Sequence, residues 1–320
     1  MAVYTTLQPN QFIELCAVLE LKPTGAPGPV PEGIENSTFF FTASRDGKIG
    51  EYVLTLVESA DQRQIDYAIA LTQQLARAGL PVPAPLTDRA GTAAHTVSDK
   101  PALVFNKAPG QHCQPALPGH CAAIGEFLAR AHRAGKGLAS SMANTRGLPW
   151  ARNMEATIKS HLSHQDRELL SLALSDWQAL VKRAPPLPSG AIHGDLFVDN
   201  ALFVGPKLSA VIDYYNACTD WWLLDVAITV NDWCVDDDGN VDQGNFTALT
   251  RAYQQIRAFT PEEHLHWQSV LCVASTRFWL SRLAARQDDT AAIPLLKLKS
   301  PNPYRQRLVK HRQAVPALPA

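Results

Sequence analysis

Apolar residues recur at helical spacing in several stretches of the chain, and most of these stretches are bounded by residues that favour helix ends. The apolar positions of 12–19 lie between Pro9 and Pro23, and those of 61–79 end in a glycine. Further helices are predicted over 117–128, 169–181 and 261–286, and from 223 onward. The helix from 261 follows a threonine N-cap and has proline and two glutamates in its first turn, which suit the positive helix end.

Runs of β-branched and aromatic residues predict strands in two parts of the chain. Residues 37–42 and 52–57 flank a polar turn and predict a β-hairpin, and 102–105 predicts another strand. In the second half, 201–204 and 208–212 flank a Gly-Pro-Lys turn and predict a second hairpin. The chain is therefore predicted to be an α+β protein in which a small mixed lobe precedes a larger, mainly helical lobe.

The lobe boundary is placed where an apolar strand ends and the connector 106–110 begins. We predict an N-terminal lobe of residues 1–105 and a C-terminal lobe of residues 106–320. The length of the chain agrees with a division into two lobes, because 320 residues correspond to about two domains. A hydrophobic content of 46% with 18% charged residues suits a soluble globular protein with a large core.

Charge and cysteine usage exclude several classes of protein. The formal net charge is −1 and no long basic run occurs, so a nucleic-acid partner is not expected. The six cysteines are dispersed without a Cys-x-x-Cys pair, which argues against a disulfide framework or a zinc site and favours a reducing compartment. No signal peptide or apolar stretch of membrane-spanning length is found, so we expect a cytoplasmic protein without a membrane partner. No oligomeric state follows from the sequence.

The second predicted hairpin carries the strongest chemical signal. Ile192–Asn200 contains Asp195 and, five residues later, Asn200, and Asp213 follows the apolar strand 208–212. A single Asp-x-x-x-x-Asn pattern is a common accident, and an aspartate before a turn is more often a cap. The hairpin, however, places the asparagine and the second aspartate near one end. Phosphoryl transfer needs this set, with one carboxylate facing the acceptor hydroxyl and two oxygen ligands holding magnesium.

The stretch resembles the catalytic loop of the aminoglycoside phosphotransferase and choline kinase superfamily, which reads His-Gly-Asp where protein kinases read His-Arg-Asp. The resemblance implies a protein-kinase-like bilobal fold that uses ATP and Mg²⁺. It implies that Asp195 is the catalytic carboxylate and that Asn200 and Asp213 bind the metal. His193 belongs to the same catalytic loop, where we expect it to brace the loop, and Asp225 is expected to accept backbone N–H bonds from the loop.

The resemblance also implies where the nucleotide binds. The turn 33–38 corresponds to the loop over the phosphates, and the connector after the strand 102–105 corresponds to the hinge at the adenine edge. On local sequence alone the first segment would be an ordinary hairpin turn. One departure is that Thr55 occupies the position of the strand lysine, and the helix 61–79 contains no glutamate to pair with a lysine. The implied nucleotide-binding residues are Asn36, Ser37, Thr38, Thr55, Phe105 and Lys107.

A narrower resemblance covers nearly the whole chain. The segment Tyr52–Glu58, which includes the threonine, looks like the equivalent segment of the bacterial homoserine kinases of this superfamily. The further segments that resemble these kinases are Glu32–Ser37, Arg146–Trp150, Ile212–Cys218, Asn231–Cys234 and Arg277–Leu283. This resemblance implies that ATP phosphorylates the side-chain hydroxyl of L-homoserine, a step toward threonine.

Homoserine carries an ammonium and a carboxylate, so its pocket needs an acid and a base besides the catalytic aspartate. The candidates are Asp232 and Arg277, with Asn231 and Arg282 next. For Arg277, a structural pairing with a helix carboxylate is an equal alternative.

Two other functions stay open on the sequence. The same chemistry could serve choline, ethanolamine, an aminoglycoside or another hydroxy amino acid. Alternatively, Thr55 and the missing helix glutamate would suit a non-catalytic nucleotide-binding protein. The intact set Asp195, Asn200 and Asp213 favours the enzyme.

Overall fold

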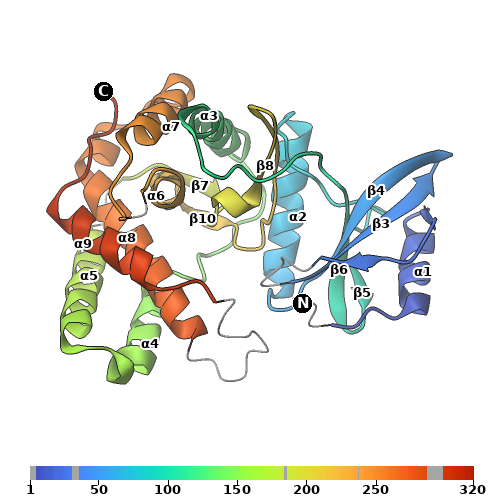
Figure 1. Ribbon diagram of the computed structural model, residues 1–320, viewed down its shortest axis with the longest axis horizontal. Helices are drawn as coiled ribbons and strands as arrows, with labels where there is room; N and C mark the ends of the chain where they lie inside the picture. The colour runs from blue at the N-terminus through green and yellow to red at the C-terminus, as the bar shows by residue number, and fades with distance from the viewer. Residues whose placement is uncertain (1–4, 31–35, 184–185, 237, 287–297) are drawn as a thin grey trace. The chain divides into compact units, whose positions relative to one another are not determined.

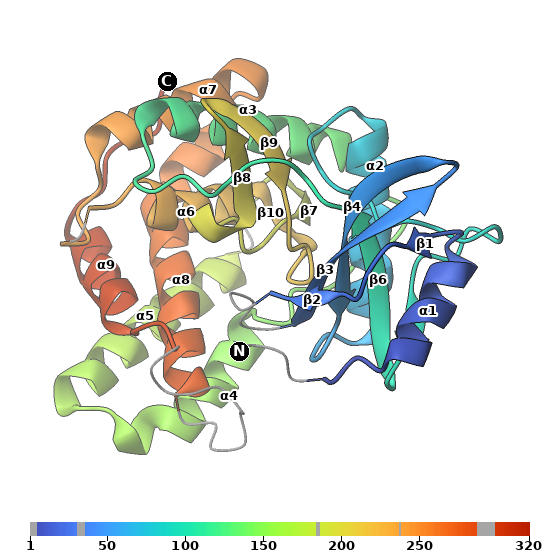
Figure 2. The same cartoon turned by 45° about the vertical axis from the view of Figure 1, so that its right-hand side comes forward.

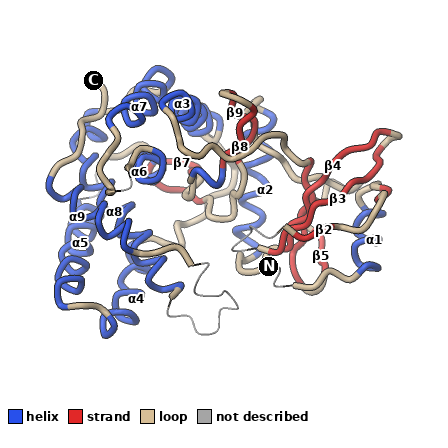
Figure 3. The backbone as a smooth tube through the Cα atoms, in the orientation of Figure 1, coloured by secondary structure: helices blue, strands red, loops and turns tan. Residues whose placement is uncertain are grey.

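The structure is a computed structural model that describes residues 5–30, 36–183, 186–236, 238–286 and 298–320 (Figure 1). The chain divides into two compact units, Met1–Pro109 and Gly110–Ala320. The first unit is built around an antiparallel sheet and the second is mainly helical, so the predicted α+β class is confirmed (Figure 3).

The first unit contains one antiparallel sheet whose strands differ in length. The strand order is β1-β3-β4-β6-β5, and β2 also pairs with β3. Its elements are α1 (Pro9–Val18), β1 (Lys22–Pro23), β2 (Gly28–Pro29), β3 (Ser37–Arg45), β4 (Lys48–Leu56), α2 (Gln62–Arg77), β5 (His95–Val97) and β6 (Lys100–Asn106). The predicted first hairpin is β3 and β4, which pair along their full length from Ser37–Leu56 to Arg45–Lys48.

Alternation along β3 explains how α1 packs. Phe39 and Phe41 are buried on one face of the strand, whereas Phe40 between them is exposed on the other. Phe12 of α1 meets Phe41 edge to face at a ring-centroid distance of 5.0 Å, and Tyr52 of β4 stacks on Phe41 from the next strand. Figure 2 shows α1 alongside this sheet. One hydrophobic core cluster of the first unit therefore lies between α1 and one sheet face.

The helix α2 shows why its start could be predicted. The carboxylate of Asp61 accepts from the backbone N–H of Gln64, and the Gln64 side chain accepts from the backbone N–H of Asp61. This reciprocal capping box satisfies two donors that a helix N-terminus otherwise leaves without partners. The same arrangement occurs at Thr260 and Glu263 and begins the long helix that was predicted from residue 261.

The second unit combines helices with two short antiparallel ladders, β7–β10 and β8–β9. Its elements are α3 (Pro118–Ala134), α4 (Leu148–Ile158), η1 (Lys159–His161), α5 (His164–Arg183), β7 (Ser189–Ile192), η2 (Val198–Asn200), β8 (Ala201–Val204), β9 (Lys207–Val211), β10 (Cys218–Trp221), α6 (Trp222–Trp233), α7 (Gln243–Ile256), α8 (Pro261–Ala285) and α9 (Asn302–Gln313). The middle of α8 is buried on all sides because α4, α5, α6 and α9 pack around it (Figure 1).

Helices α3 and α7 touch most closely at Gly125. An ideal Cβ at this position would lie 2.1 Å from the Leu249 carbonyl oxygen, so any side chain forces the two helices apart. We expect Gly125→Ala to lower the free energy of unfolding by about 1–3 kcal/mol, as overpacked cores do. Gly119→Ala in the same helix is the control, because a Cβ there meets nothing within 4 Å. Urea unfolding of both variants tests this, and equal stabilities would contradict it.

Candidate active site

The loop after β7 is shaped by a glycine that no other residue can replace without movement. Gly194 has a φ of +75°. A Cβ at this position would lie 2.7 Å from the carbonyl oxygen of Asn216. Both the left-handed backbone and the close approach require glycine. The glycine of the His-Gly-Asp sequence therefore lets the chain turn tightly before Asp195.

The buried carboxylate of Asp225 accepts hydrogen bonds from two backbone N–H groups of this loop. The Oδ2 atom of Asp225 accepts from the backbone N–H of His193 at 2.9 Å, and its Oδ1 atom accepts from that of Gly194 at 2.8 Å. His132 Nε2 lies 3.1 Å from Oδ2. Burial opposes ionisation of Asp225, but the hydrogen bond and charge of His132 and the loop N–H groups hold its pKa below the ordinary value. Asp225, at the first turn of α6, therefore fixes the backbone just before Asp195.

His193 links the loop to the neighbouring hairpin. Its Nε2–H donates to the carbonyl oxygen of Ile212 at 3.0 Å, and its Nδ1 accepts from the backbone N–H of Asp195 at 3.2 Å. These two bonds require the neutral ring with the proton on Nε2. Burial lowers the pKa of His193, which keeps the ring neutral. With both nitrogens engaged, the ring braces the loop and is not placed to carry a proton.

Asn200 comes directly before strand β8, and Asp213 comes two residues after the end of strand β9 of the same hairpin. The backbone N–H of Ile212 donates to the Asn200 carbonyl at 2.9 Å, which places the start of β8 beside the end of β9. The Asn200 Nδ2 donates to the Asp195 carbonyl oxygen at 2.8 Å, so its Oδ1 faces the other way. Asp213 has a φ of +66°, a strained conformation for a residue with a side chain, and such strain concentrates at functional sites.

These two oxygen-bearing side chains fit a magnesium ion that a nucleotide brings with it. Magnesium takes one or two protein oxygen ligands and completes its shell with phosphates and water. Among the described residues there is no cluster of three or more His, Cys, Asp and Glu side chains that could hold a metal by themselves. Two protein oxygen ligands suit a metal that is bound together with nucleotide phosphates.

Asn216 also contacts the catalytic loop and was not among the predicted residues. Its Nδ2 lies 3.4 Å from Oδ2 of Asp195, a long hydrogen bond that orients this carboxylate. The residue stands three positions after Asp213, inside a segment that carries the resemblance to homoserine kinases. Its contact depends on the tight turn at Gly194, which the sequence pattern alone does not show.

Comparison with known families agrees with this geometry. The profile of the phosphotransferase enzyme family matches residues 28–259, which span parts of both units and the whole loop 192–200. The chain belongs to this family.

Several relatives of this phosphotransferase are homoserine kinases. The homoserine kinase of Pseudomonas aeruginosa (strain LESB58) is 40% identical over 287 residues, which cover 90% of each protein. That of Paraburkholderia phytofirmans (strain DSM 17436 / LMG 22146 / PsJN) is 39% identical over 333 residues, covering 100% of this chain and 98% of the relative. Amicoumacin kinase, solved in complex with AMP-PNP, Ca²⁺ and Ami, has the same fold, with a TM-score of 0.67, 14% identity and coverage of 96% and 92%.

In the first unit of the phosphotransferase, the predicted phosphate-loop residues meet Glu58. Asn36 Oδ1 accepts from the backbone N–H of Glu58 at 3.1 Å, and the Ser37 hydroxyl donates to Glu58 Oε1 at 2.6 Å. Lys100 Nζ lies 3.2 Å from Glu58 Oε2. Burial opposes ionisation of Glu58, but its bonds to Ser37, Thr5 and Lys100 lower its pKa below the ordinary value. Sequence reasoning did not single out Glu58 and Lys100, and the rest of the predicted phosphate loop, 33–35, lies outside the described residues.

The remaining predicted nucleotide residues lie in or beside the sheet. Thr55 of β4 is buried between Thr38 of β3 and Leu103 of β6, its partners in register. Phe105 is on β6. Lys107 follows β6, where its Nζ lies 3.0 Å from Glu51 Oε1 and 4.8 Å from the centroid of the Phe40 ring. Nucleotide contacts from these residues stay predictions.

Two of the residues predicted to bind the acceptor substrate, Asn231 and Asp232, make hydrogen bonds within the helical unit. Asn231 is fully buried in α6, where its Oδ1 accepts from Nε2 of His311 at 2.7 Å and its Nδ2 donates to Ser275 Oγ at 3.1 Å. Asp232 Oδ2 accepts from the backbone N–H of Val198 at 2.9 Å and so supports the turn η2 of the catalytic loop. Burial raises the pKa of Asp232. Asp232 also lines a pocket of about 560 Å³ together with Asp199 and Lys299.

The predicted arginines lie on α8 beside the catalytic loop. Arg277 is only 2% exposed, and its Nη1 would lie 3.9 Å from a Cβ placed on Gly194. Its Nε and Nη1 have no hydrogen-bond partner among the described residues, and burial lowers its pKa. Arg282 Nη1 donates to the Ser300 carbonyl at 2.9 Å, and its guanidinium lies over the Tyr304 ring. An acceptor role for these residues stays a prediction.

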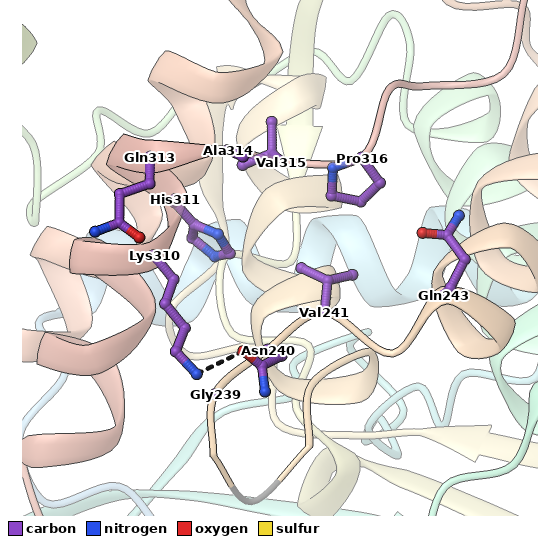
Figure 4. A pocket seen from close by; sticks show the side chains of 10 residues that line it. All are labelled: Gly239, Asn240, Val241, Gln243, Lys310, His311, Gln313, Ala314, Val315 and Pro316. Atoms are coloured by element: carbon purple, nitrogen blue, oxygen red, sulfur yellow. Dashed lines mark hydrogen bonds between the residues drawn. The ribbon is translucent and has the colours of Figure 1, made fainter.

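A second pocket, of about 380 Å³, lies between α9 and the loop before α7 (Figure 4). Lys310 crosses it to donate to Asn240 Oδ1 at 2.6 Å. His311 points toward it, and burial lowers the pKa of that ring to about 4, which keeps it neutral for its bond to Asn231. The pocket shares no lining residue with the loop 192–200.

Within the described ranges, no helix is long and apolar enough to cross a membrane.

Proposed function

We propose that this phosphotransferase transfers the γ-phosphoryl group of ATP to the side-chain hydroxyl of L-homoserine, a step toward threonine. The observation that carries the chemistry is the set Asp195, Asn200 and Asp213, which the Asp225 brace and the β8–β9 hairpin hold. The choice of homoserine rests on the relatives, which share about 40% of their residues with this chain over nine-tenths or more of its length.

In the proposed reaction, Asp195 faces the acceptor hydroxyl. The hydroxyl oxygen forms a bond to the γ-phosphorus as the bond from this phosphorus to the β–γ bridging oxygen breaks, and ADP leaves. The hydroxyl proton passes to the Asp195 carboxylate. Asn216 orients that carboxylate, and Asn200 fixes the backbone at the same residue through its Nδ2–H. The chain thus contributes mainly positioning, which is the larger part of catalysis in this class of reaction.

Asn200 and Asp213 would hold the Mg²⁺ ion that accompanies ATP. Bound there, the ion supplies charge neutralisation for the phosphate oxygens. Oδ1 of Asn200 and the Asp213 carboxylate are the ligands we assign. We also assign ATP contacts to the residues of the first unit that were predicted from the sequence: Asn36, Ser37, Thr38, Thr55, Phe105 and Lys107.

The test is an ADP-release assay with a panel of acceptors. Purified protein with ATP and Mg²⁺ is expected to release ADP when L-homoserine is added, and phosphorus NMR is expected to show one phosphomonoester product. Choline, ethanolamine and kanamycin are expected to give at most background release. The proposal fails if ATP raises the melting temperature while no acceptor supports turnover, or if another acceptor is used in preference to homoserine.

A further inference from the structure

Two arginines from neighbouring helices stack against one buried tyrosine. The guanidinium carbon of Arg282, on α8, and that of Arg307, on α9, each lie 4.4 Å from the centroid of the Tyr304 ring. The helices pack against each other along their length (Figure 1). We name Arg282, Tyr304 and Arg307 the arginine–tyrosine cluster. A cluster of this kind concentrates positive charge on an apolar base.

Several donors of this cluster are buried without a partner. The Nε and Nη1 atoms of Arg307 and the hydroxyl of Tyr304 have no hydrogen-bond partner within the described part of the chain. A buried donor that is left without an acceptor costs about 1–3 kcal/mol, and more when it is charged. These atoms are therefore available to an acceptor from outside the described residues.

Two other arginines of α9 have structural roles, because each forms an ion pair with α5. Arg305 pairs with Asp166, and Arg312 pairs with Asp176, so both are neutralised by α5. Arg307 makes no such ion pair among the described residues. The nearby carboxylate of Asp232 accepts the backbone N–H of Val198, and its charge interacts with that of Arg307 without a direct ion pair. Arg307 is thus the arginine of α9 that has no direct ion pair among the described residues.

The cluster adjoins the catalytic loop. The ring of Phe197, two residues after Asp195, lies 6.4 Å from that of Tyr304 and 4.7 Å from that of Phe278. Burial is the main influence on both side chains, lowering the pKa of Arg282 and raising that of Tyr304, and the charge of Asp195 acts on both as a smaller, raising influence. A small acceptor with its hydroxyl at Asp195 would therefore extend over Phe197 toward the cluster.

We propose that the arginine–tyrosine cluster binds the carboxylate of the acceptor amino acid, with Arg307 as its main ligand. The inference rests on the proposed function and adds to it the group that the site recognises. Arginine binds a carboxylate through two parallel N–H donors, and the Tyr304 hydroxyl supplies a third. The same positive charge disfavours choline, ethanolamine and aminoglycosides, which would place a cation here.

A comparison of two acceptors tests the role of Arg307. The acceptors are L-homoserine and 3-aminopropan-1-ol, which has the same hydroxyl, carbon chain and amine but no carboxylate. In Arg307→Gln, the ratio of kcat/KM for homoserine to that for 3-aminopropan-1-ol is expected to fall about 10- to 100-fold, the value of hydrogen bonds to a charged group. Tyr304→Phe keeps the ring under both guanidinium groups and is expected to lower the same ratio about 5- to 10-fold.

Arg305→Gln is the matched control, because it removes a paired arginine from the same helix. Its acceptor ratio is expected to stay within about twofold of the wild-type ratio. Equal losses for both acceptors in Arg307→Gln would show a structural role and overturn the inference. A raised KM for ATP with an unchanged acceptor ratio would assign the cluster to nucleotide phosphate and overturn it too. Failure of the proposed function is distinguishable, because the wild-type protein would then not turn over homoserine.

Discussion

Asp195→Asn is expected to lower kcat for homoserine by about 10²- to 10⁴-fold, the range that positioned proton transfer contributes. Asparagine has the shape of aspartate but cannot take the proton of the acceptor hydroxyl. The fold should be unaffected, because the bonds that shape this loop come from backbone atoms of residue 195: its N–H donates to His193 and its carbonyl accepts from Asn200. Steady-state ADP release at saturating ATP and homoserine measures the effect.

Asp199→Asn is the matched control for this variant. It neutralises a carboxylate four residues further along the same loop, which pairs with Lys299 on the surface. An exposed ion pair of this kind contributes about 0–1 kcal/mol, so folding should be preserved and kcat should fall far less than in Asp195→Asn. If Asp199→Asn abolished turnover and Asp195→Asn retained it, Asp195 would not be the proton acceptor.

Asp225→Ala is expected to have the largest effect on stability, a loss of about 3–5 kcal/mol in the free energy of unfolding. The change removes the acceptor of two backbone N–H groups, those of His193 and Gly194, and of the His132 ring. All three donors are buried and would be left without a partner. Urea unfolding at pH 7 measures the loss. Asp176→Ala, which breaks the exposed ion pair with Arg312, is expected to cost at most about 1 kcal/mol.

Acid should reduce the difference between wild type and Asp225→Ala. The folded-state pKa of Asp225 lies below the ordinary aspartate value of 3.8, so its stabilising contribution is fully present above that value. The contribution is lost as pH falls below 3.8 and through the folded-state pKa, because the unfolded chain then binds the extra proton. A stability difference that grew on acidification would contradict the assigned direction.

The parts of the fold that sequence predicted are those with long periodic patterns or local start signals. The capping boxes at Asp61 and Thr260 are complete within four residues, so they mark helix starts without tertiary information. Three short or weakly patterned elements were not predicted. Strands β7 and β10 have only four residues each, and α4 has only two buried side chains. Each therefore depends on contacts with neighbouring elements more than on a local sequence pattern. The same holds for α7, whose buried face mixes apolar and polar residues.

The catalytic loop shows the same division between local and distant information. Asp195, Asn200 and Asp213 are close in sequence and lie around one hairpin, so their pattern could be recognised. The contact of Asn231 with His311 joins residues 80 positions apart, and that of Asp232 with Val198 joins residues 34 apart. No spacing rule connects such pairs. For the same reason Arg307 and Tyr304 could not be related to the loop before the packing of α8 on α9 was known.

The close approach of Gly194 to the backbone of Asn216 limits which residues can replace this glycine. A protein-kinase loop places arginine where this chain has glycine, and here that arginine would collide with a main-chain oxygen rather than with a replaceable side chain. This loop can therefore not be converted into a His-Arg-Asp loop by exchanging Gly194 alone. The segment after Asp213 must shift at the same time, so the two stretches are expected to have been inherited as a unit.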